Sequence, residues 1–395
     1  MKLKFFHDVN IIYSKKDNNY FSGGFHYSIW ERYLKVFELL DVHTRLKYEE
    51  NISEGFKLSS GRNVNILPIS SYKNFRSLIN ISSINKDIEA FISDNDGYLL
   101  RLPSVIGFIT GMKLIHKNKK YFVEVVGSGF DSFYYKGGFM GKLISFPAYY
   151  LQKKIIKNAS VVTYITESYL QNKFPTKGIQ FNGIANIHFD FSLRNEISPD
   201  QIKEIVEKKP SHHYKIGLIG SLNVDYKGHL IALKALKELL DRNVNVTLYF
   251  VGQGNIKKFD KFISKYHLEG NVVHLGMLSA GQEIQEFLNE IDIYIQPSKT
   301  EGHGRALVEA VYSGAVSFGS NVGGIPDTLL KEYLFDPNNY KSLANLIETA
   351  IYDKNYATKN IISNFNNIKK YQTDLIESNR EKALRKYRKI LEESQ

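Results

Sequence analysis

The chain has 395 residues, of which 43% are apolar and 24% charged, a composition that indicates folded domains and not a disordered chain. It contains no cysteine, which excludes a disulfide framework and thiolate metal sites and fits a reducing compartment. The first residues lack the features of a signal peptide and no run of about 18 apolar residues occurs, so we expect no membrane-spanning helix. The length predicts two domains.

The net charge of +11 is unevenly distributed along the chain. Residues 1–195 contain 26 basic and 16 acidic residues, whereas the remaining residues contain 26 and 25. Within 101–180, 12 basic residues stand against 3 acidic ones. A basic domain favours an anionic partner, such as lipid headgroups, nucleic acid or a phosphorylated substrate, although a solvated basic face would give the same count.

The first half alternates short apolar runs with helical stretches. Helices are expected at 25–40 and 72–92. Strands are expected at 2–6, 63–67, 121–126, 160–165 and 178–182. Strands that alternate with helices indicate βαβ units and a parallel sheet.

The second half repeats this alternation. Strands are expected at 214–220, 246–252, 272–276 and 291–297, with a helix at 229–240 after the first of them. The stretch 183–213 has the polar composition of a linker. We therefore expect domains at 1–195 and 196–372, followed by a charged amphipathic helix at 373–395.

The segment TEGHGRALVE, residues 300–309, follows the strand at 291–297. A helix that begins near Gly304 and Arg305 would present free amides and partial positive charge to an anion. Glu309 lies one turn further on the same face and could accept hydrogen bonds from sugar hydroxyls, as could Glu301 in the loop. The segment favours a nucleotide-sugar site, although a helix-capping glutamate beside a surface glutamate would also explain it.

Glycine-containing turns follow the other strands of this half. Lys227 and Gly228 open the helix after the first strand, and Lys227 could reach the same anion. VGQGN, HLGML and SNVGGIPD follow later strands. In a doubly wound sheet these turns line one crevice at the carboxyl ends of the strands.

The order and spacing of these motifs resemble those of the retaining family-four glycosyltransferases, also called glycosyl transferases group 1. The resemblance covers the E-x7-E of Glu301 and Glu309, GSLNVDYKG, VGQGN, HLGML and VGGIPD, and in the first half YFSGGFHYSIWERYL. It implies an α/β GT-B fold, in which two Rossmann-like doubly wound domains face a central cleft and the C-terminal helix crosses back to the first domain.

The resemblance also implies roles for the matching residues. Glu309 would bind the ribose hydroxyls, Glu301 would contact the donor hexose and support developing charge, and Lys227 would neutralise the diphosphate. Gly23 and Gly24 would approach the phosphates from the first domain. The implied donor-binding set is Gly23, Gly24, Ser221, Gly252, Met277, His303, Gly304, Arg305, Ala306 and Glu309.

The chain departs from the family pattern at several positions. Ser221 stands where an arginine is usual, and Arg305 or Lys299 could supply the missing charge. His303 replaces an aromatic residue and could stack on, or hydrogen-bond to, the donor sugar. The first domain lacks the usual histidine in VVGSGFD, where Asp131 becomes the candidate for acceptor contact and a catalytic role.

Three further polar residues of the first domain are weaker candidates. His7 and Asp8 end the first strand, and Arg101 could hold a phosphate, but all three types are common at strand ends and surfaces. Asp94 and Asp96 form a D-x-D pattern that could bind a metal–nucleotide complex, although turn chemistry explains it well. Because Lys227 and a helix end can carry the phosphate charge, we expect no metal and no other cofactor.

The implied reaction is transfer of a sugar from a nucleoside diphosphate sugar to a saccharide or lipid-linked acceptor, with retention of configuration, in bacterial surface polysaccharide synthesis. The aromatic and basic segment 137–160 suits an anionic headgroup surface, although a core helix with lysines on its solvent side would give the same pattern. On the first interpretation we expect a cytoplasmic protein with access to the inner face of the plasma membrane.

Two other functions compete with this hypothesis. An epimerase on the same fold would not need the basic domain. A nucleic-acid-binding protein would leave both glutamates unexplained, so we expect no nucleic acid partner.

Overall fold

The structure, a computed structural model, describes residues 1–52, 55–69, 78–93, 95–136, 138–185, 202, 206, 213–279 and 281–394. The chain forms two compact units, the first comprising Met1–Asn186 with Asp374–Gln395 and the second Ile187–Thr373. The sequence placed the division at 195/196 and 372/373. Most of the expected linker at 183–213 lies outside the described residues.

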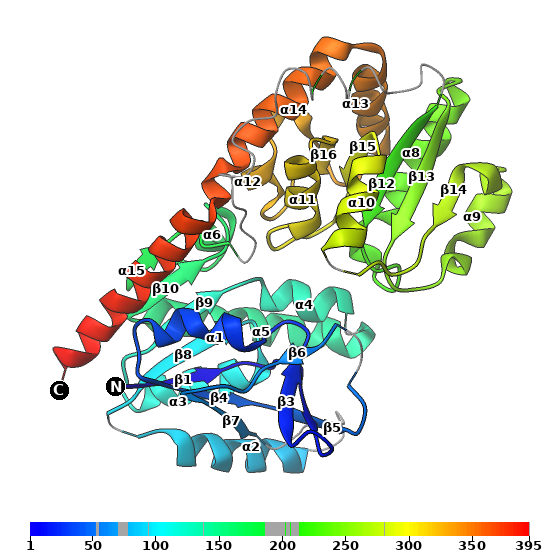
Figure 1. Cartoon of the computed structure of the whole chain (residues 1–395). Helices are drawn as coiled ribbons and strands as arrows, with labels where there is room; N and C mark the ends of the chain where they lie inside the picture. Colours follow the sequence, from blue (N-terminus) through cyan, green and yellow to red (C-terminus); the bar gives the residue numbers. More distant parts are fainter. Residues whose placement is uncertain are drawn as a thin grey trace. The chain divides into compact units, whose positions relative to one another are not determined.

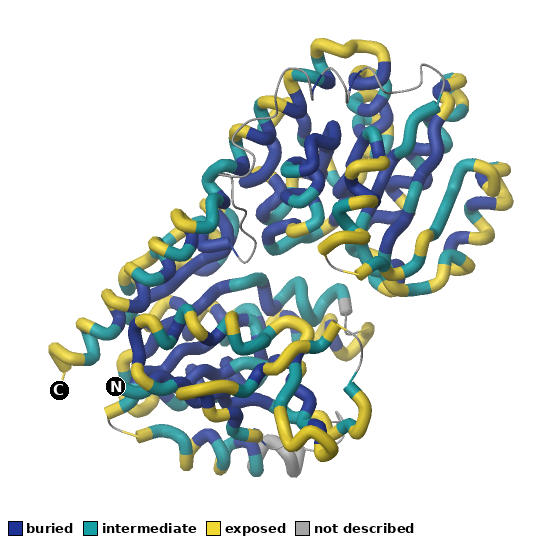
Figure 2. The backbone as a smooth tube through the Cα atoms, in the orientation of Figure 1, coloured by how far each residue is buried: buried dark blue, intermediate teal, exposed yellow. Residues whose placement is uncertain are grey.

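A seven-stranded parallel sheet forms the centre of the first unit (Figure 1). Its order is β11-β10-β9-β8-β1-β4-β7. The strands are β1 (Lys2–Phe6), β4 (Leu39–Thr44), β7 (Val64–Pro68), β8 (Gly97–Leu102), β9 (Phe122–Val125), β10 (Val161–Tyr164) and β11 (Ile179–Phe181). The strands are mostly buried (Figure 2), which explains their continuous apolar runs.

This unit differs from the sequence expectation in several places, and β8 is one strand that was not expected. The expected helix at 25–40 is wrong in its second half, because α1 (Tyr27–Leu34) ends early and β4 starts at Leu39. β4 lies between β1 and β7, and periodicity cannot distinguish such a buried run from a buried helix. The sequence also missed a small second sheet of β2 (Ile11–Ser14), β3 (Asn19–Ser22), β5 (Leu46–Glu49) and β6 (Lys57–Leu58).

Helices cover the larger sheet and complete its core. They are α1, α2 (Leu78–Phe91), α3 (Val105–His116), α4 (Gly129–Lys136), α5 (Gly138–Asn158), α6 (Tyr169–Lys173) and α15 (Thr373–Glu392). The part of the expected helix before Leu78 lies outside the described residues. None of the described helices combines the length and the apolar character that crossing a bilayer requires.

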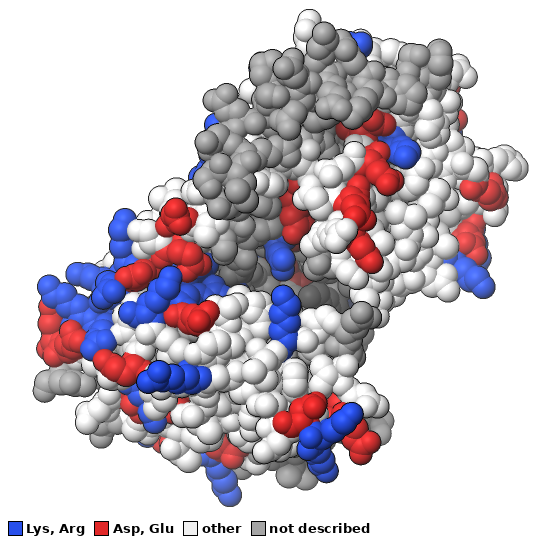
Figure 3. Space-filling view, viewed as in Figure 1, with Lys and Arg blue, Asp and Glu red and all other residues white. Residues whose placement is uncertain are grey.

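The C-terminal helix α15 is an integral part of the first unit. Tyr387 is fully buried, accepts a hydrogen bond from the Tyr98 amide at 2.8 Å and donates to the Lys120 carbonyl oxygen at 3.1 Å. Its outer face carries i,i+4 ion pairs such as Glu381 with Arg385, and Figure 3 shows charges of both signs interspersed there. The return of this helix to the first domain, implied by the family resemblance, is confirmed.

The second unit contains a six-stranded parallel sheet of order β14-β13-β12-β15-β16-β17. Its strands are β12 (Tyr214–Ile219), β13 (Val246–Val251), β14 (Val272–His274), β15 (Ile293–Gln296), β16 (Val316–Ser320) and β17 (Leu334–Phe335). Its helices are α8 (His229–Asp241), α9 (Asp260–Lys265), α10 (Gln282–Glu290), α11 (Arg305–Ser313), α12 (Ile325–Thr328), α13 (Tyr340–Tyr352) and α14 (Lys354–Ile368).

The strand order of the second unit creates a switch point beside β12. The chain moves from β12 to β13 and β14 on one side, and then resumes with β15 and β16 on the other. The loops after β12 and β15 therefore leave the sheet next to each other. Open parallel sheets bind ligands at this place.

Candidate functional site

Lys227 is the last residue of a short 3-10 turn, Asp225–Lys227, in the loop after β12. The next residue, Gly228, has a φ of +79°, and a Cβ built on it would lie 1.8 Å from the carbonyl oxygen of Pro297. Only glycine allows this approach between the loops after β12 and β15. The amide of Lys299 donates to the Tyr226 carbonyl oxygen at 2.7 Å and ties the two loops together.

The joined loops bring Lys227 and Glu301 into contact. Lys227 Nζ lies 2.6 Å from Glu301 Oε2, and the two side chains are 19% and 13% exposed. Ser298 Oγ donates to the same carboxylate oxygen at 3.3 Å, and Gln296 Nε2 lies 3.5 Å away. An ammonium group has three donors, so a lysine held by one carboxylate can still donate to a bound anion.

The start of α11 lies directly after Glu301. Gly304, with a φ of +75°, is the N-cap, and the amides of Arg305 and Ala306 have no backbone acceptor among the described residues. Gly323, in the loop after β16, has a φ of +56°, and its Cβ would lie 1.8 Å from the Glu301 carbonyl oxygen. Close packing of a third strand-end loop therefore fixes the backbone of Glu301.

Glu309 lies in α11, one turn after Arg305. Within the described ranges, no group donates a hydrogen bond to its carboxylate. Burial raises its pKa, and the positive charge of Arg305 opposes that effect. The carboxylate is thus partly desolvated without the hydrogen bonds that would compensate, as expected of a group that receives donors from a ligand.

His303 is 5% exposed, and neither ring nitrogen has a hydrogen-bond partner among the described residues. Its ring packs edge-on against Tyr371 with centroids 4.7 Å apart. Burial lowers its pKa to about 3, and Lys370 and Arg305 contribute to that shift, so the ring is neutral at ordinary pH. An orphaned buried imidazole beside a helix N-terminus could hydrogen-bond a ligand, and the role expected for it towards the donor sugar stays a prediction.

The loops after β12, β13 and β14 also pack closely together. A Cβ on Gly252 would lie 2.3 Å from the Gly220 carbonyl oxygen, and the Gly252 amide donates to Gly276 at 2.7 Å. Ser221 Oγ donates to the Gln253 carbonyl oxygen at 3.0 Å, so this hydroxyl supports the loop. Met277 is 77% exposed next to these turns.

Sequence reasoning did not single out Lys258, a cation that the structure places beside the Ser221 loop. It lies in the 3-10 turn Ile256–Phe259, donates to the Leu222 carbonyl oxygen at 3.1 Å and pairs with Asp225. Its only signal in the sequence is its position four residues after Gly254 of the VGQGN turn. Arg305 and Lys299, the expected replacements for the missing arginine, are both exposed.

Gly23 and Gly24 belong to the first unit and lie in a turn that precedes α1. The Ser22 hydroxyl accepts from the amides of Gly24 and Phe25 at 3.4 and 3.1 Å. The turn follows β3, so the hairpin of β2 and β3 separates it from β1. A Cβ on Gly24 would meet nothing within 4 Å, which leaves room for a ligand.

Asp131 lies in the first turn of α4 and already has partners in the first unit. Lys173 Nζ approaches its Oδ2 at 3.0 Å, and the Tyr169 hydroxyl lies 3.5 Å from the same atom. The carboxylate is therefore engaged before any ligand binds. Its expected contact with an acceptor stays a prediction.

The other candidates of the first unit have structural partners. Asp8 accepts from the Val105 amide at 2.6 Å, at the start of α3. Arg101 is ion-paired with buried Glu124, which accepts a hydrogen bond from Tyr33 at 2.9 Å. His7 contacts the Arg101 carbonyl oxygen at 3.0 Å, and burial lowers its pKa to about 3.

The D-x-D pattern is only partly described, because Asp94 lies outside the described residues. Asp96 forms an ion pair of 2.6 Å with Lys4 and accepts from Ser93. Among the described residues, no group of three His, Asp or Glu side chains is arranged to hold a metal ion. The expected independence of metals and cofactors stays a prediction.

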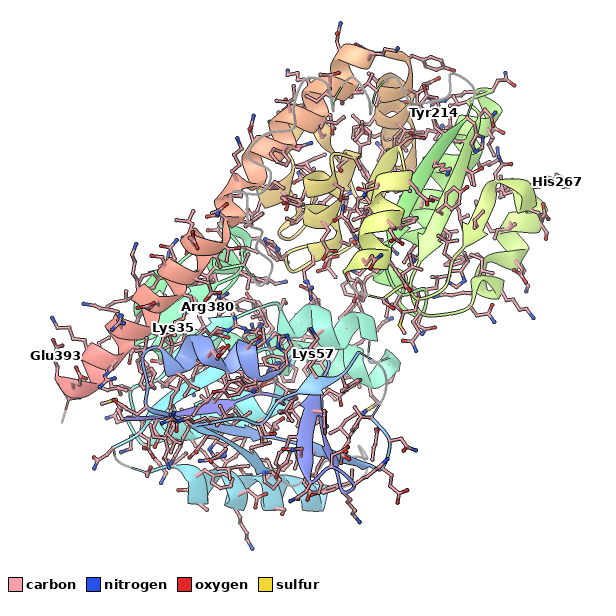
Figure 4. The ribbon with its side chains drawn as sticks, in the orientation of Figure 1. Lys35, Lys57, Tyr214, His267, Arg380 and Glu393 are labelled. Atoms are coloured by element: carbon pink, nitrogen blue, oxygen red, sulfur yellow. The ribbon has the colours of Figure 1, made fainter. Side chains whose placement is uncertain are left out.

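A pocket of about 570 Å³ lies elsewhere in the second unit. Tyr214, labelled in Figure 4, and Asn245 line it at the amino ends of β12 and β13, together with Ala350 and Ala357. It is therefore at the opposite edge of the sheet from Lys227 and Glu301. Its lining offers no cluster of charged groups comparable to theirs.

Comparison with known proteins places the chain among sugar-transferring enzymes. A family model described as glycosyl transferases group 1 matches residues 200–367. Protein CapJ of Staphylococcus aureus is 41% identical over 392 residues, which cover 99% of this chain and 97% of CapJ.

Solved structures extend the likeness to the whole fold. Sucrose-phosphate synthase from Thermosynechococcus elongatus is similar with a TM-score of 0.64, at 16% identity over 99% of both chains. HepE of Anabaena, solved in complex with UDP-glucose, has a TM-score of 0.62 at 16% identity over 100% of both chains. These likenesses confirm the GT-B fold class expected from the sequence.

Proposed function

We propose, since the chain belongs to the glycosyl transferases of group 1 and is a transferase, that it moves a hexose or related sugar from a nucleoside diphosphate donor to a saccharide acceptor. The anomeric configuration would be retained. The observation that carries this proposal is the pairing of Lys227 with Glu301 directly beside the open amides of α11, with Glu309 one turn further along that helix.

In this reaction the chain mainly supplies electrostatic stabilisation. The bond between the sugar C1 and the diphosphate oxygen breaks, and negative charge develops on the leaving diphosphate. Lys227 and the amides of Arg305 and Ala306 are donors that suit this charge. The acceptor hydroxyl oxygen attacks C1 on the same face, and its proton passes to a leaving phosphate oxygen, so that no enzyme nucleophile is required.

The two glutamates divide the recognition of the donor. Glu309 would accept hydrogen bonds from the ribose hydroxyls, which would supply the donors that its partly buried carboxylate lacks among the described residues. Glu301 would contact the hexose and support the charge that develops at C1. His303, neutral and without a partner in the described part of the chain, would donate to or accept from a sugar hydroxyl.

The donor nucleotide and the acceptor are further parts of the proposal. HepE was solved with UDP-glucose, which supports a nucleoside diphosphate sugar as the donor here. The backbone at Gly276 and Met277 would contact the base. The acceptor would be a lipid-linked saccharide of bacterial surface polysaccharide synthesis, reached from the cytoplasmic side, in agreement with the basic composition of residues 101–180.

Glu309→Ala tests the proposal. The variant should bind UDP-sugars or GDP-sugars about 10- to 100-fold more weakly, because the ribose hydroxyls lose the charged carboxylate to which they would donate hydrogen bonds. Calorimetry with the donor that most raises the melting temperature gives the measurement. Glu290→Ala, at an exposed position that ends α10, is the matched control. Equal affinity in wild type and Glu309→Ala would contradict the site.

The pH dependence of binding gives a second readout of Glu309. Its pKa is raised in the folded protein, so the carboxyl becomes protonated at a higher pH than an exposed glutamate. A protonated carboxyl is a poorer acceptor for two ribose hydroxyls. Donor affinity should therefore fall as the pH is lowered through this pKa, and Glu309→Gln should abolish that limb of the profile.

A further inference from the structure

One face of α5 exposes large apolar side chains. Phe139, Met140, Leu143, Phe146 and Tyr150, which we call the α5 stripe, are 78%, 53%, 56%, 57% and 66% exposed. At about 3.6 residues per turn, all but Met140 project within roughly 60° of one another. The buried residues of α5, which include Gly141, Ser145, Ala148 and Gln152, lie on the opposite face. The stripe is thus the outward face of a firmly seated helix.

The packing of α4 against α5 holds the stripe outward. A Cβ on Gly141 would lie 2.3 Å from the Phe133 carbonyl oxygen, so the two helices are in close backbone contact. Gln152 accepts from the Gly129 amide at 2.6 Å and donates to the Gly127 carbonyl oxygen at 2.8 Å. Because these contacts lock the inner face, α5 cannot rotate to bury the stripe without breaking them.

Basic residues continue the same face beyond the stripe. Lys153, Lys154 and Lys157 occupy the last turns of α5, on the side that carries Tyr150. Acidic residues are scarce in this part of the sequence, because 101–180 contains only Glu124, which is buried, Asp131, which is paired with Lys173, and Glu167. The outward face of α5 therefore passes from apolar to positively charged along its length.

We propose that the α5 stripe inserts into the interface of an anionic lipid bilayer while the three lysines contact the phosphate headgroups. Twelve residues of helix, 139–150, span about 17 Å, which is too short to cross a hydrocarbon core of about 30 Å but suits a helix lying in the interface. An anionic lipid surface supplies the negative charge that would balance these lysines. A second copy of this basic unit offers little of it.

This inference deepens the proposed function, on which it rests for the idea of a lipid-linked acceptor, because it assigns the bilayer contact to a particular helix. Seated in this way, the first unit would meet an acceptor whose lipid lies in the same bilayer. The exposed surface of α15 shows the contrast, since it carries charges of both signs and no comparable apolar run.

Vesicle flotation tests the inference with the full chain. At physiological salt, the wild type should float with vesicles of phosphatidylglycerol and phosphatidylcholine and remain behind with phosphatidylcholine alone. Phe139→Ser combined with Phe146→Ser should lower the bound fraction at least about 10-fold, since two large apolar groups no longer insert. Tyr352→Ser, which removes a side chain 69% exposed at the end of α13, should float as the wild type does.

The charged part of the face is tested separately. Lys153→Gln with Lys157→Gln should weaken binding several-fold and reduce its salt dependence. Lys153 and Lys157 are exposed, so the melting temperature of this variant should change little. Leu143→Ser provides an independent check of the stripe should the double phenylalanine variant lose solubility.

Other outcomes would overturn the inference. Failure of the wild type to float with anionic vesicles would exclude the bilayer as partner. A wild-type dimer, detected by light scattering and split by the stripe variants, would assign the face to a second copy. Donor affinity distinguishes the two proposals, because the stripe variants should keep it, whereas Glu309→Ala should weaken it.

Discussion

The carboxyl strand ends of the two sheets hold similar charged residues but use them differently. In the first unit, Arg101 and Glu124 form a buried pair with Tyr33, and Asp8 binds the first amide of α3. In the second unit, Lys227 and Glu301 are paired at a partly open position, and Glu309 has no donor within the described residues.

The difference shows where the fold requires its charges and where it does not. The charged groups of the first unit connect strands and helices, so their removal should destabilise the structure. In the second unit, glycine contacts at Gly228 and Gly323 fix the backbone that carries Lys227 and Glu301, so the fold does not depend on their ion pair alone. Their removal should leave the unit folded and affect the ligand.

The largest expected effect on activity concerns Lys227, which we compare with Lys237, a lysine of the same unit outside the proposed site. Lys227→Ala should lower kcat about 100- to 1,000-fold, as loss of a donor to a developing anion does. Its melting temperature should change little, since Ser298 still donates to Glu301. Lys237→Ala, which loses an i,i+4 pair with Asp241 and a contact with the Tyr266 ring, is the control for turnover. Wild-type turnover in Lys227→Ala would contradict a role of this lysine in the reaction.

The largest expected effect on stability belongs to the first unit. Glu124→Gln leaves Arg101, whose side chain is 11% exposed, without its counter-charge, and Arg32 and Arg380 are close enough to influence the same carboxylate. We expect a loss of about 3 to 5 kcal/mol in the free energy of unfolding, measured by denaturant titration, with unchanged donor affinity. Glu31→Gln, at an exposed position of α1, should stay within about 0.5 kcal/mol of the wild type. A stable but inactive Glu124→Gln would instead place this pair in the site.

Two histidines, one in each unit, add a pH dependence to this comparison. His7 and His303 have pKa values lowered to about 3 by burial, against 6.5 when unfolded. Between these values the unfolded state binds more protons, so stability is present above pH 6.5 and is lost as the pH falls. Each should cost about 2 kcal/mol at pH 5.

His7→Leu and His303→Leu should each reduce the decline in stability between pH 7 and pH 5, as measured by thermal unfolding at both values. Only His303→Leu should also weaken donor binding, because His303 lies in the second unit beside the start of α11. Equal donor affinity in both variants would remove His303 from the proposed site.

The smallest expected effect concerns Asp131, which has a structural partner in Lys173 and is also the candidate for contact with the acceptor. Asp131→Asn weakens a partly exposed pair with Lys173 and should cost about 1 kcal/mol or less of stability. If it contacts the acceptor as predicted, the KM for the acceptor should rise while donor affinity stays the same. An unchanged KM for the acceptor would show that Asp131 stabilises the first unit and does not contact the acceptor.

The second unit was more predictable from the sequence than the first for a physical reason. Its strands are short apolar runs that end in glycine turns, and 214–220 and 246–252 match β12 and β13 to within one residue. In the first unit, β4 and β8 are central strands with no such punctuation and were missed. The small sheet has only short strands, which carry little pattern.

The site was predictable in composition but not in its contacts. Spacing and family resemblance identified Lys227, Glu301 and Glu309. The ion pair between Lys227 and Glu301 depends on the approach of Gly228 to Pro297, which joins residues far apart in the chain. Lys258 was missed because nothing local marks a lysine in a polar turn.

The position of α15 has a consequence for synthesis of the protein. Leu384 and Tyr387, near the end of the chain, share a core with Phe5 and Phe37, near its start. At about 5 to 20 residues per second, translation leaves the amino-terminal strands without this part of their interior for tens of seconds. The second unit, contiguous in sequence, is complete before it. If translation terminated shortly before Thr373, the second unit of the released polypeptide could still fold. Its amino-terminal segment would expose apolar surface that chaperones and proteases recognise.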